Sequence, residues 1–379
     1  MRILLASGAS YAPPKGGSTR SNLVWFRALA EKGHECRVVS TAAGEAGETV
    51  ADGIAILRVR DLALHAERLT EEIRAFRPDW VLVSSEDVTQ RLLHAAERGA
   101  PGRLVYLAHT PQFFPFGPES WNPNAEATRI IERAAGVVAI GRHMAGYIEK
   151  HSQAKATVIH PPIYGTPVPS GGGQMILMIN PCVVKGIEIF VEVAKRLPEF
   201  QFGALIGWGT TAADRALLAR QSKIELIGSV RDIDEVLSRS RMLLMPSIWY
   251  EGFGLIVMEA MLRGLPVVSS DSGGLMEAKE GTGYVIPVLP IERYEPVFDE
   301  NHMPCPVRGT QDVEPWVEAV KKLSEDEAAH REESERSLAA ARRFVAGLRI
   351  EAFEEYLLAL KPRLTDAQRA LLMKRLARQ

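Results

Sequence analysis

Two glutamates, Glu251 and Glu259, stand out because their surroundings differ from those of ordinary surface acids. Glu251 lies in a glycine-bearing turn, and Glu259 interrupts an otherwise apolar run over residues 255–262. A helix that is apolar on all sides is usually buried, and a carboxylate inside it needs a hydrogen-bonding partner or a ligand. Each acid also has a structural explanation, as a turn residue for Glu251 and as an i,i+4 partner of Arg263 for Glu259. Together with the flanking glycines, they predict a ligand-binding turn followed by a buried helix.

A lysine and a histidine at strand ends are the next candidates. Lys185 lies between a predicted strand over 175–179 and a predicted helix over 187–197. It could be a solvated surface charge, or a point charge that stabilises a leaving group. His109 follows a predicted strand over 103–108 and could serve either the structure or the positioning of a substrate. The sequence alone leaves both choices open.

Strands and helices alternate along most of the chain, which is typical of parallel sheets covered by helices on both faces. In such sheets, ligands bind beyond the carboxyl ends of the strands. The alternation stops at a proline- and glycine-rich segment over 160–173 and then starts again. We therefore expect an α/β protein with two domains joined by this segment.

The segment 246–274 resembles the E-x7-E region of the retaining, nucleotide-sugar-dependent glycosyltransferases of family 4 (GT4), which have the GT-B fold. The resemblance implies two Rossmann-like domains that face each other across a cleft, with C-terminal helices that pack back on the first domain. It implies an acceptor-binding domain at residues 1–165, a nucleotide-sugar-binding domain at 166–345 and the crossing helices at 346–379. It also implies that no metal ion and no cofactor is needed.

The resemblance assigns a role to each candidate. Glu251 would bind hydroxyls of the donor sugar, Lys185 would stabilise the departing diphosphate, and His109 would position the sugar. Glu259 would accept hydrogen bonds from the ribose of the nucleotide. The other expected donor-binding residues lie in loops and at a helix start, and they are Gly16, Gly17, Asn180, Gly207, Ile227, Ser229, Val230, Gly252, Phe253, Gly254 and Leu255.

Asn180 departs from the family pattern, which usually has an arginine at this position. An asparagine can donate a hydrogen bond but brings no charge, and the loss of one oxyanion-type donor costs about 2.7–4 kcal/mol in other enzymes. Either helix N-termini and another arginine (Arg20, Arg142 or Arg231) bind the diphosphate, or the donor is held differently. The run from Gly207 to Ala212 also matches the G-x-G-x-x-A dinucleotide fingerprint, although this match is weak.

The loop after His109 is unusually rich in aromatic residues. These side chains could form a lip that binds the acceptor, which we favour, or a small satellite core beneath the loop. The residues concerned are Phe113, Phe114, Phe116 and Trp121.

Composition narrows the class of protein. With 379 residues and a formal net charge of −2, the chain has no basic excess that would indicate nucleic-acid binding. Three cysteines lie far apart, and no apolar run is long enough for a signal peptide or a membrane span. We expect a cytoplasmic protein. A basic amphipathic end over 365–379 would pack on the first domain or contact the inner face of a membrane weakly.

The predicted function is the transfer of a sugar from a nucleotide-diphosphate sugar to a hydroxyl of a sugar, lipid-linked or small-molecule acceptor. The base, the sugar, the acceptor, the oligomeric state and the role of the proline-rich stretch 287–306 stay open. A sugar-nucleotide epimerase or phosphorylase, or a two-lobed ligand-binding protein without enzymatic activity, are the alternatives. A nicotinamide-dependent dehydrogenase is a more distant one.

Overall fold

The computed structural model describes residues 1–166, 173–230 and 232–363. The chain divides into two compact units, and each is described by itself. The first unit comprises Met1–Pro162 together with the chain from Arg349 onward, and the second comprises Ile163–Leu348. Part of the predicted linker, residues 167–172, and the predicted last helix over 365–379 lie outside the described residues.

An eight-stranded sheet forms the centre of the first unit, in the order β3-β4-β2-β1-β5-β6-β7-β8. All neighbouring strands are parallel except the pair β3–β4 at one edge. The strands are β1 (Arg2–Ser7), β2 (Glu35–Thr41), β3 (Gly47–Ala51), β4 (Ile54–Val59), β5 (Trp80–Ser84), β6 (Leu104–Ala108), β7 (Gly136–Ala139) and β8 (Thr157–Val158). The antiparallel strand β3 is an addition that the sequence did not predict, because its glycine-led run is short and mostly exposed.

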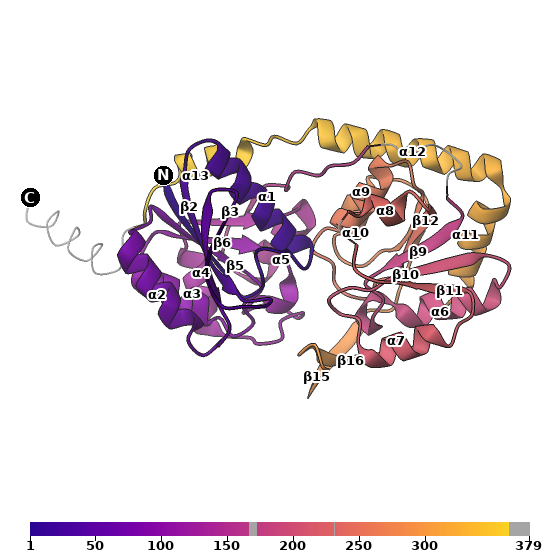
Figure 1. The fold of residues 1–379 in the computed structure, drawn as a ribbon, viewed down its shortest axis with the longest axis horizontal. Coiled ribbons are helices and arrows are strands. Elements are labelled where there is room, and N and C mark those ends of the chain that lie inside the picture. The colour runs from indigo at the N-terminus through magenta and orange to yellow at the C-terminus, as the bar shows by residue number, and fades with distance from the viewer. Residues whose placement is uncertain (167–172, 231, 364–379) are drawn as a thin grey trace, which may run out of the picture. The chain divides into compact units, whose positions relative to one another are not determined.

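Helices cover both faces of this sheet (Figure 1). They are α1 (Gly17–Glu31), α2 (His65–Phe76), α3 (Arg91–Gly99), α4 (Ala125–Arg133), α5 (Arg142–His151) and the 3₁₀ turn η1 (Pro111–Phe113). The central strand β1 is apolar and fully buried from Ile3 to Ala6, as a strand covered on both faces must be.

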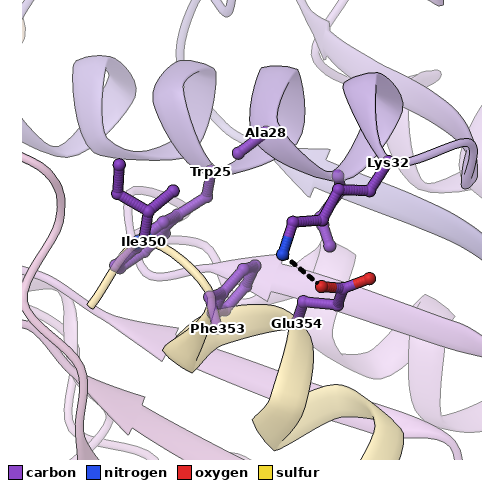
Figure 2. Close-up of a pocket in the computed structure, with 7 residues that line it drawn as sticks. Trp25, Ala28, Lys32, Ile350, Phe353 and Glu354 are labelled. Atoms are coloured by element: carbon purple, nitrogen blue, oxygen red, sulfur yellow. Dashed lines mark hydrogen bonds and ion pairs between the residues drawn. The ribbon is translucent and has the colours of Figure 1, made fainter.

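The C-terminal helix α13 (Ala352–Ala359) packs on the first unit, as the sequence predicted. The ring of Phe353 stacks on Trp25 of α1 with centroids 4.6 Å apart. Glu354 pairs with Lys32 at 2.6 Å and with His34 at 2.7 Å. Figure 2 shows these α13 side chains turned toward α1. An apolar stack with an ion pair beside it thus holds the returning chain in place.

The second unit is built on a six-stranded sheet in the order β11-β10-β9-β12-β13-β14, whose neighbours are all parallel. The strands are β9 (Met175–Ile179), β10 (Gln201–Leu205), β11 (Ile224–Ile227), β12 (Ser240–Met245), β13 (Val267–Ser270) and β14 (Val285–Ile286). The helices are α6 (Ile187–Arg196), α7 (Ala212–Ala219), α8 (Asp234–Leu237), α9 (Leu255–Leu262), α10 (Leu275–Lys279), α11 (Glu314–Glu325) and α12 (Glu327–Ala346), with the 3₁₀ turn η2 (Val183–Lys185).

A lysine inside the second unit links α10 to its surroundings. Lys279 is buried, and its Nζ donates to the backbone carbonyl of Val267. Burial lowers the pKa of Lys279 to about 8, and the nearby carboxylate of Glu333 on α12 opposes this shift. Burial in turn raises the pKa of Glu333. The opposite charges of Lys279 on α10 and Glu333 on α12 therefore attract each other; Figure 1 shows both helices in the second unit.

The proline-rich stretch near 287–306 forms an antiparallel hairpin of β15 (Ile291–Phe298) and β16 (Pro304–Arg308). Two contacts tie it to the helices of the second unit. Glu300 at its tip accepts a hydrogen bond from the backbone N–H of Ala212 at the start of α7, at 2.6 Å, and Arg308 pairs with Glu188 at 2.5 Å. In the described ranges, no helix is long and apolar enough to cross a membrane.

Candidate active site

Glu251 lies in the loop between β12 and α9, and a second loop packs directly on it. Gly274 donates its N–H to the carbonyl of Glu251 at 2.8 Å. A Cβ at Gly273, which has φ +59°, would lie 2.4 Å from that same carbonyl oxygen. The Gly273-Gly274 pair therefore allows the loop after β13 to approach the backbone of Glu251. Two loops that follow neighbouring strands thus fix this residue in place.

The carboxylate of Glu251 forms the centre of a compact polar cluster. Its Oε1 accepts hydrogen bonds from Lys185 Nζ at 2.5 Å and from Ser247 Oγ at 2.6 Å. Only about a tenth of the Lys185 and Glu251 side chains is exposed, and Ser247 is fully buried. Within the described part of the chain, both hydrogen bonds of the carboxylate end on Oε1. The second oxygen, Oε2, therefore stays available to a ligand.

Lys185 reaches this cluster because its own loop packs against the end of β12. Gly186 has φ +81°, and a Cβ there would lie 2.0 Å from the carbonyl oxygen of Pro246. The ammonium group of Lys185 also lies 5.5 Å from the centre of the Trp249 ring, within the range of a cation–π contact. The Lys-Gly pair after β9 is thus what brings a positive charge next to Glu251.

Asn180 joins the loops that follow β9 and β10. It adopts a left-handed conformation with φ +57°, which asparagine tolerates better than most residues. Its Oδ1 accepts the N–H of Gly209 at 2.8 Å, and a Cβ at Gly207 would lie only 2.4 Å from that oxygen. The glycines of the Gly207–Gly209 turn therefore make room for Asn180. The Nδ2 group is buried and has no partner among the described residues.

Glu259 lies on α9 and is only 4% exposed. Arg263, its predicted structural partner, donates to the backbone carbonyl of Glu259 at 2.8 Å and pairs through Nε with Asp234. The guanidinium group thus contacts the backbone of Glu259 and a side chain on α8. The helix begins after Gly254, which has φ +104° and provides no side-chain cap. Its first N–H groups therefore suit an anion.

The segment after β11 is more open. Ile227 is buried, and its carbonyl already accepts the N–H of Ile206 at 2.9 Å. Ser229 is exposed and Val230 is partly exposed. These two are the better placed of the three for contacts with a nucleotide. Arg231, one candidate for the missing positive charge, lies outside the described residues.

In the first unit, His109 is buried directly after β6. Its Nε2 lies 3.0 Å from Asn22 Oδ1, and its backbone N–H donates to Ser85 Oγ at 3.1 Å. The imidazole lies against the ring of Trp25, with centroids 5.9 Å apart. Burial lowers the pKa of His109, and the smaller influence of Glu86 raises it. The ring is therefore kept in its neutral form at neutral pH.

The predicted glycine loop precedes α1. Gly16 has an extended backbone, and its N–H donates to Thr19 Oγ1 at 3.1 Å, as does the N–H of Lys15 at 2.9 Å. Thr19, which the sequence did not single out, thus accepts hydrogen bonds from two backbone N–H groups of the loop. The helix itself begins at Gly17.

Two profiles of known families match the chain. Residues 15–164 match a model described as Glycosyltransferase Family 4, and residues 174–293 match one described as Glycosyl transferases group 1. The chain belongs to the family 4 (group 1) glycosyltransferases. Each match covers one of the two predicted domains, so both halves carry the family's pattern.

Individual relatives are more distant. The chain is similar to the sulfoquinovosyl transferase SQD2 of Arabidopsis thaliana, with 27% identity over 304 residues, 69% of this chain and 59% of that protein. It thus spans less than two thirds of the length of this curated relative.

Solved structures share the fold of this glycosyltransferase at low sequence identity. Sucrose-phosphate synthase from Thermosynechococcus elongatus is 16% identical, with a TM-score of 0.70 over 99% of this chain and 98% of that one. HepE from Anabaena, in complex with UDP and glucose, is 17% identical, with a TM-score of 0.70 over 95% of this chain and 100% of that one. These neighbours show the GT-B fold with its two parallel α/β sheets.

The structure brings some of the predicted residues together. Lys185 and Glu251 touch, and Asn180 contacts the turn that begins at Gly207. Ser247, Asn22 and Thr19 were missed, because serine, asparagine and threonine occur in many turns and give no signal of their own. Among residues 1–166, 173–230 and 232–363, no three His, Cys, Asp or Glu side chains are grouped so that they could hold a metal ion.

The aromatic loop differs from the favoured prediction. Phe114 and Phe116 are buried and lie with Tyr106 and Tyr147 in a small core. The ring centroid of Phe114 lies 5.4 Å from that of Phe116 and 6.1 Å from that of Tyr147. For these two rings the structure supports the satellite core, because they pack on each other and on two buried tyrosines. Phe113 and Trp121 are partly exposed and pack edge to face at 5.2 Å. Acceptor binding stays a prediction for this second pair.

Proposed function

We propose that this protein is a retaining, metal-independent glycosyltransferase of the hexosyltransferase type. It would move a sugar from a nucleotide-diphosphate sugar to a hydroxyl of an acceptor. The observation that carries the proposal is the contact of Lys185 with Glu251 beside the uncapped start of α9. A cation, a carboxylate and free helix N–H groups are the three features that a diphosphate-linked sugar requires.

We further propose that the second unit binds the donor and the first unit the acceptor. In the second unit, Lys185 would face the departing diphosphate, where negative charge grows as the bond between sugar and oxygen breaks. The open Oε2 of Glu251 would accept from hydroxyls of the sugar. Glu259, buried in α9, would accept from the ribose hydroxyls. The N–H groups of α9 after Gly254 and the amide of Asn180 would donate to phosphate oxygens.

The acceptor would meet the first unit, and the neutral His109 of that unit would position a hydroxyl of the donor sugar. Phe113 and Trp121 offer partly exposed rings of the kind on which sugars pack. UDP-sugars are the first donors to test, because the Anabaena neighbour is described with UDP and glucose. We also propose a cytoplasmic location, with weak contact at the inner face of a membrane through the basic segment 365–379.

A donor panel combined with one variant tests the proposed function. The purified full chain would be mixed with UDP-, GDP-, ADP- and dTDP-sugars, and its melting temperature and the release of nucleoside diphosphate would be measured. A ligand at 100 times its Kd adds about 2.7 kcal/mol of stability, which a thermal shift detects easily. Chelator added to an active mixture should leave the rate unchanged.

Glu259→Gln should weaken binding of the preferred nucleotide by about tenfold or more, because a hydrogen bond to a charged group contributes about 1.5–3 kcal/mol. Glu318→Gln, an exposed acid on α11, is the matched control and should bind normally. Titration calorimetry with the nucleoside diphosphate measures both. Equal affinity of Glu259→Gln and wild type would remove Glu259 from the donor site, and the absence of any shift or release across the panel would refute the proposed function.

A further inference from the structure

A chain of hydrogen bonds runs from the buried His109 to the partly exposed Glu86 in the first unit. His109 Nε2 lies 3.0 Å from Asn22 Oδ1, and Asn22 Nδ2 lies 2.8 Å from Ser84 Oγ. Ser84 Oγ forms a short hydrogen bond to Glu86 Oε2. Asn22, Ser84 and His109 are at most 1% exposed. The chain thus connects α1, the end of β5 and the end of β6.

The carboxylate of Glu86, at the end away from His109, sets the direction of every bond. An ionised carboxylate can only accept, so the hydroxyl proton of Ser84 must point to Glu86. The Ser84 oxygen is then an acceptor, and the Asn22 group that faces it must be the amide NH₂. The carbonyl oxygen of Asn22 consequently faces His109, and only a protonated Nε2 can bond to it. Reversing the Asn22 amide would take the Ser84 proton away from the carboxylate and leave Glu86 without a donor.

The other ring nitrogen has the opposite character. With the proton on Nε2, Nδ1 carries a lone pair and is an acceptor. This atom is buried, and no described residue donates to it. Buried polar atoms are nearly always paired, so an unpaired acceptor beside a candidate site is able to accept a hydrogen bond from a ligand. The ring is restrained by packing against Trp25, which in turn stacks on Phe353.

We propose that Asn22, oriented by Ser84 and Glu86, is a positioning residue that fixes His109 as the Nε2–H tautomer and so presents Nδ1 as an acceptor for a substrate hydroxyl. This inference rests on the proposed function only for the identity of the ligand, a polyhydroxylated substrate. Asn22 acts through His109 and does not touch the substrate. The same residues in a purely structural role would satisfy one another's hydrogen bonds without any consequence for Nδ1.

The tautomer is measured directly by two-dimensional ¹H–¹⁵N NMR of the full chain labelled at its histidine nitrogens. The His109 signals are assigned by their loss in His109→Gln. In the wild-type protein we expect a protonated Nε2 and a pyridine-type Nδ1. Ser84→Ala removes the link to Glu86 and should give a mixture of the two tautomers, and Asn22→Leu should do the same. Ser84→Thr keeps the hydroxyl and should restore the wild-type pattern.

Ser85→Ala is the matched control, because it removes a neighbouring buried hydroxyl whose hydrogen bond, among the described residues, is to the backbone N–H of His109. It should lose stability without changing the tautomer. Where a sugar donor has been found, Ser84→Ala should lower kcat/KM for transfer by about twofold, since an even mixture of tautomers leaves Nδ1 as an acceptor in only half of the molecules.

The outcomes separate this inference from the proposed function. A wild-type His109 protonated at Nδ1, or an unchanged tautomer in both Ser84→Ala and Asn22→Leu, would overturn the role of Asn22 even in an active transferase. If Asn22→Leu does not fold, Ser84→Ala with its Thr and Ser85 controls decides the question alone. The expected tautomer pattern without transfer from any donor would support the positioning role and refute the transferase.

Discussion

The two units differ in the charge of their polar clusters. Each gathers a buried polar cluster at the carboxyl ends of its parallel strands, where ligands of such sheets bind. In the first unit the cluster that faces the ligand is neutral, with His109 held by Asn22. In the second unit it is an ion pair, Lys185 with Glu251. A neutral acceptor suits a sugar hydroxyl, whereas a cation suits a diphosphate, so the contrast matches the division of labour that we propose.

The two clusters also differ in the free-energy cost of removing one of their members. Removing one partner of a buried ion pair leaves an uncompensated charge, which is strongly destabilising. Removing a neutral member of the first unit's chain, such as Asn22, leaves an unpaired polar atom, which costs about 1–3 kcal/mol. Substitutions at the ion pair should therefore have larger effects than those at the neutral residues of the two polar clusters.

The largest effect is expected at the ion pair. Lys185→Met and Glu251→Gln should each lower kcat by about 100- to 1,000-fold. The first removes the charge that stabilises the departing diphosphate, and the second removes the charged acceptor that orients the sugar. The double variant should be far less active than wild type but better than the product of the two single effects, since the groups act as one unit. Lys195→Met, in the exposed pair Lys195–Glu192, is the control and should keep its rate. Near-normal turnover in either active-site variant would show that this residue does not belong to a charged catalytic cluster in the second unit.

A smaller effect, on nucleotide binding, is expected at Asn180, a neutral residue of the second unit. Asn180→Asp keeps the acceptor for Gly209 and the tolerance for a left-handed backbone, but it replaces the buried NH₂ donor with an oxygen. We expect it to weaken binding of a nucleoside diphosphate by about tenfold or more. Asn180→Ala should instead lose the bond to Gly209 and about 1–3 kcal/mol of stability. Calorimetric titration and urea unfolding measure the two effects. If Asn180→Asp binds as well as wild type, the amide does not touch the diphosphate.

The smallest effect on transfer concerns the aromatic loop of the first unit. Phe114→Ala should lower the free energy of unfolding by about 3–5 kcal/mol, because it opens a cavity in the small core. Phe113→Ala should cost clearly less stability and should raise KM for the acceptor without changing KM for the donor. Denaturation curves and acceptor kinetics compare the two variants. Equal losses of stability would place both rings in the core and leave the acceptor without an aromatic surface in this loop.

Part of this architecture follows from local sequence. The alternation of apolar runs and helical segments predicts two parallel sheets, because a buried strand and an amphipathic helix each have a short-range pattern. The edge strand β3 and the β15–β16 hairpin escaped prediction, since they are exposed and lack that pattern. Glu251 and Glu259 were found because an acid among apolar residues violates the local expectation.

What the sequence by itself determined is therefore the family, the alternating fold and the charged residues that disturb an apolar context. Only the tertiary structure decided how the neutral residues act. Asn22 and Ser84 are 62 positions apart, and Asn22 and His109 are 87 apart, yet both pairs are hydrogen-bonded. Their contact depends on the position of β5 between β1 and β6. Asparagine and serine have no conspicuous local signature, so their role emerges only when the sheet brings strand ends from distant parts of the chain to one edge.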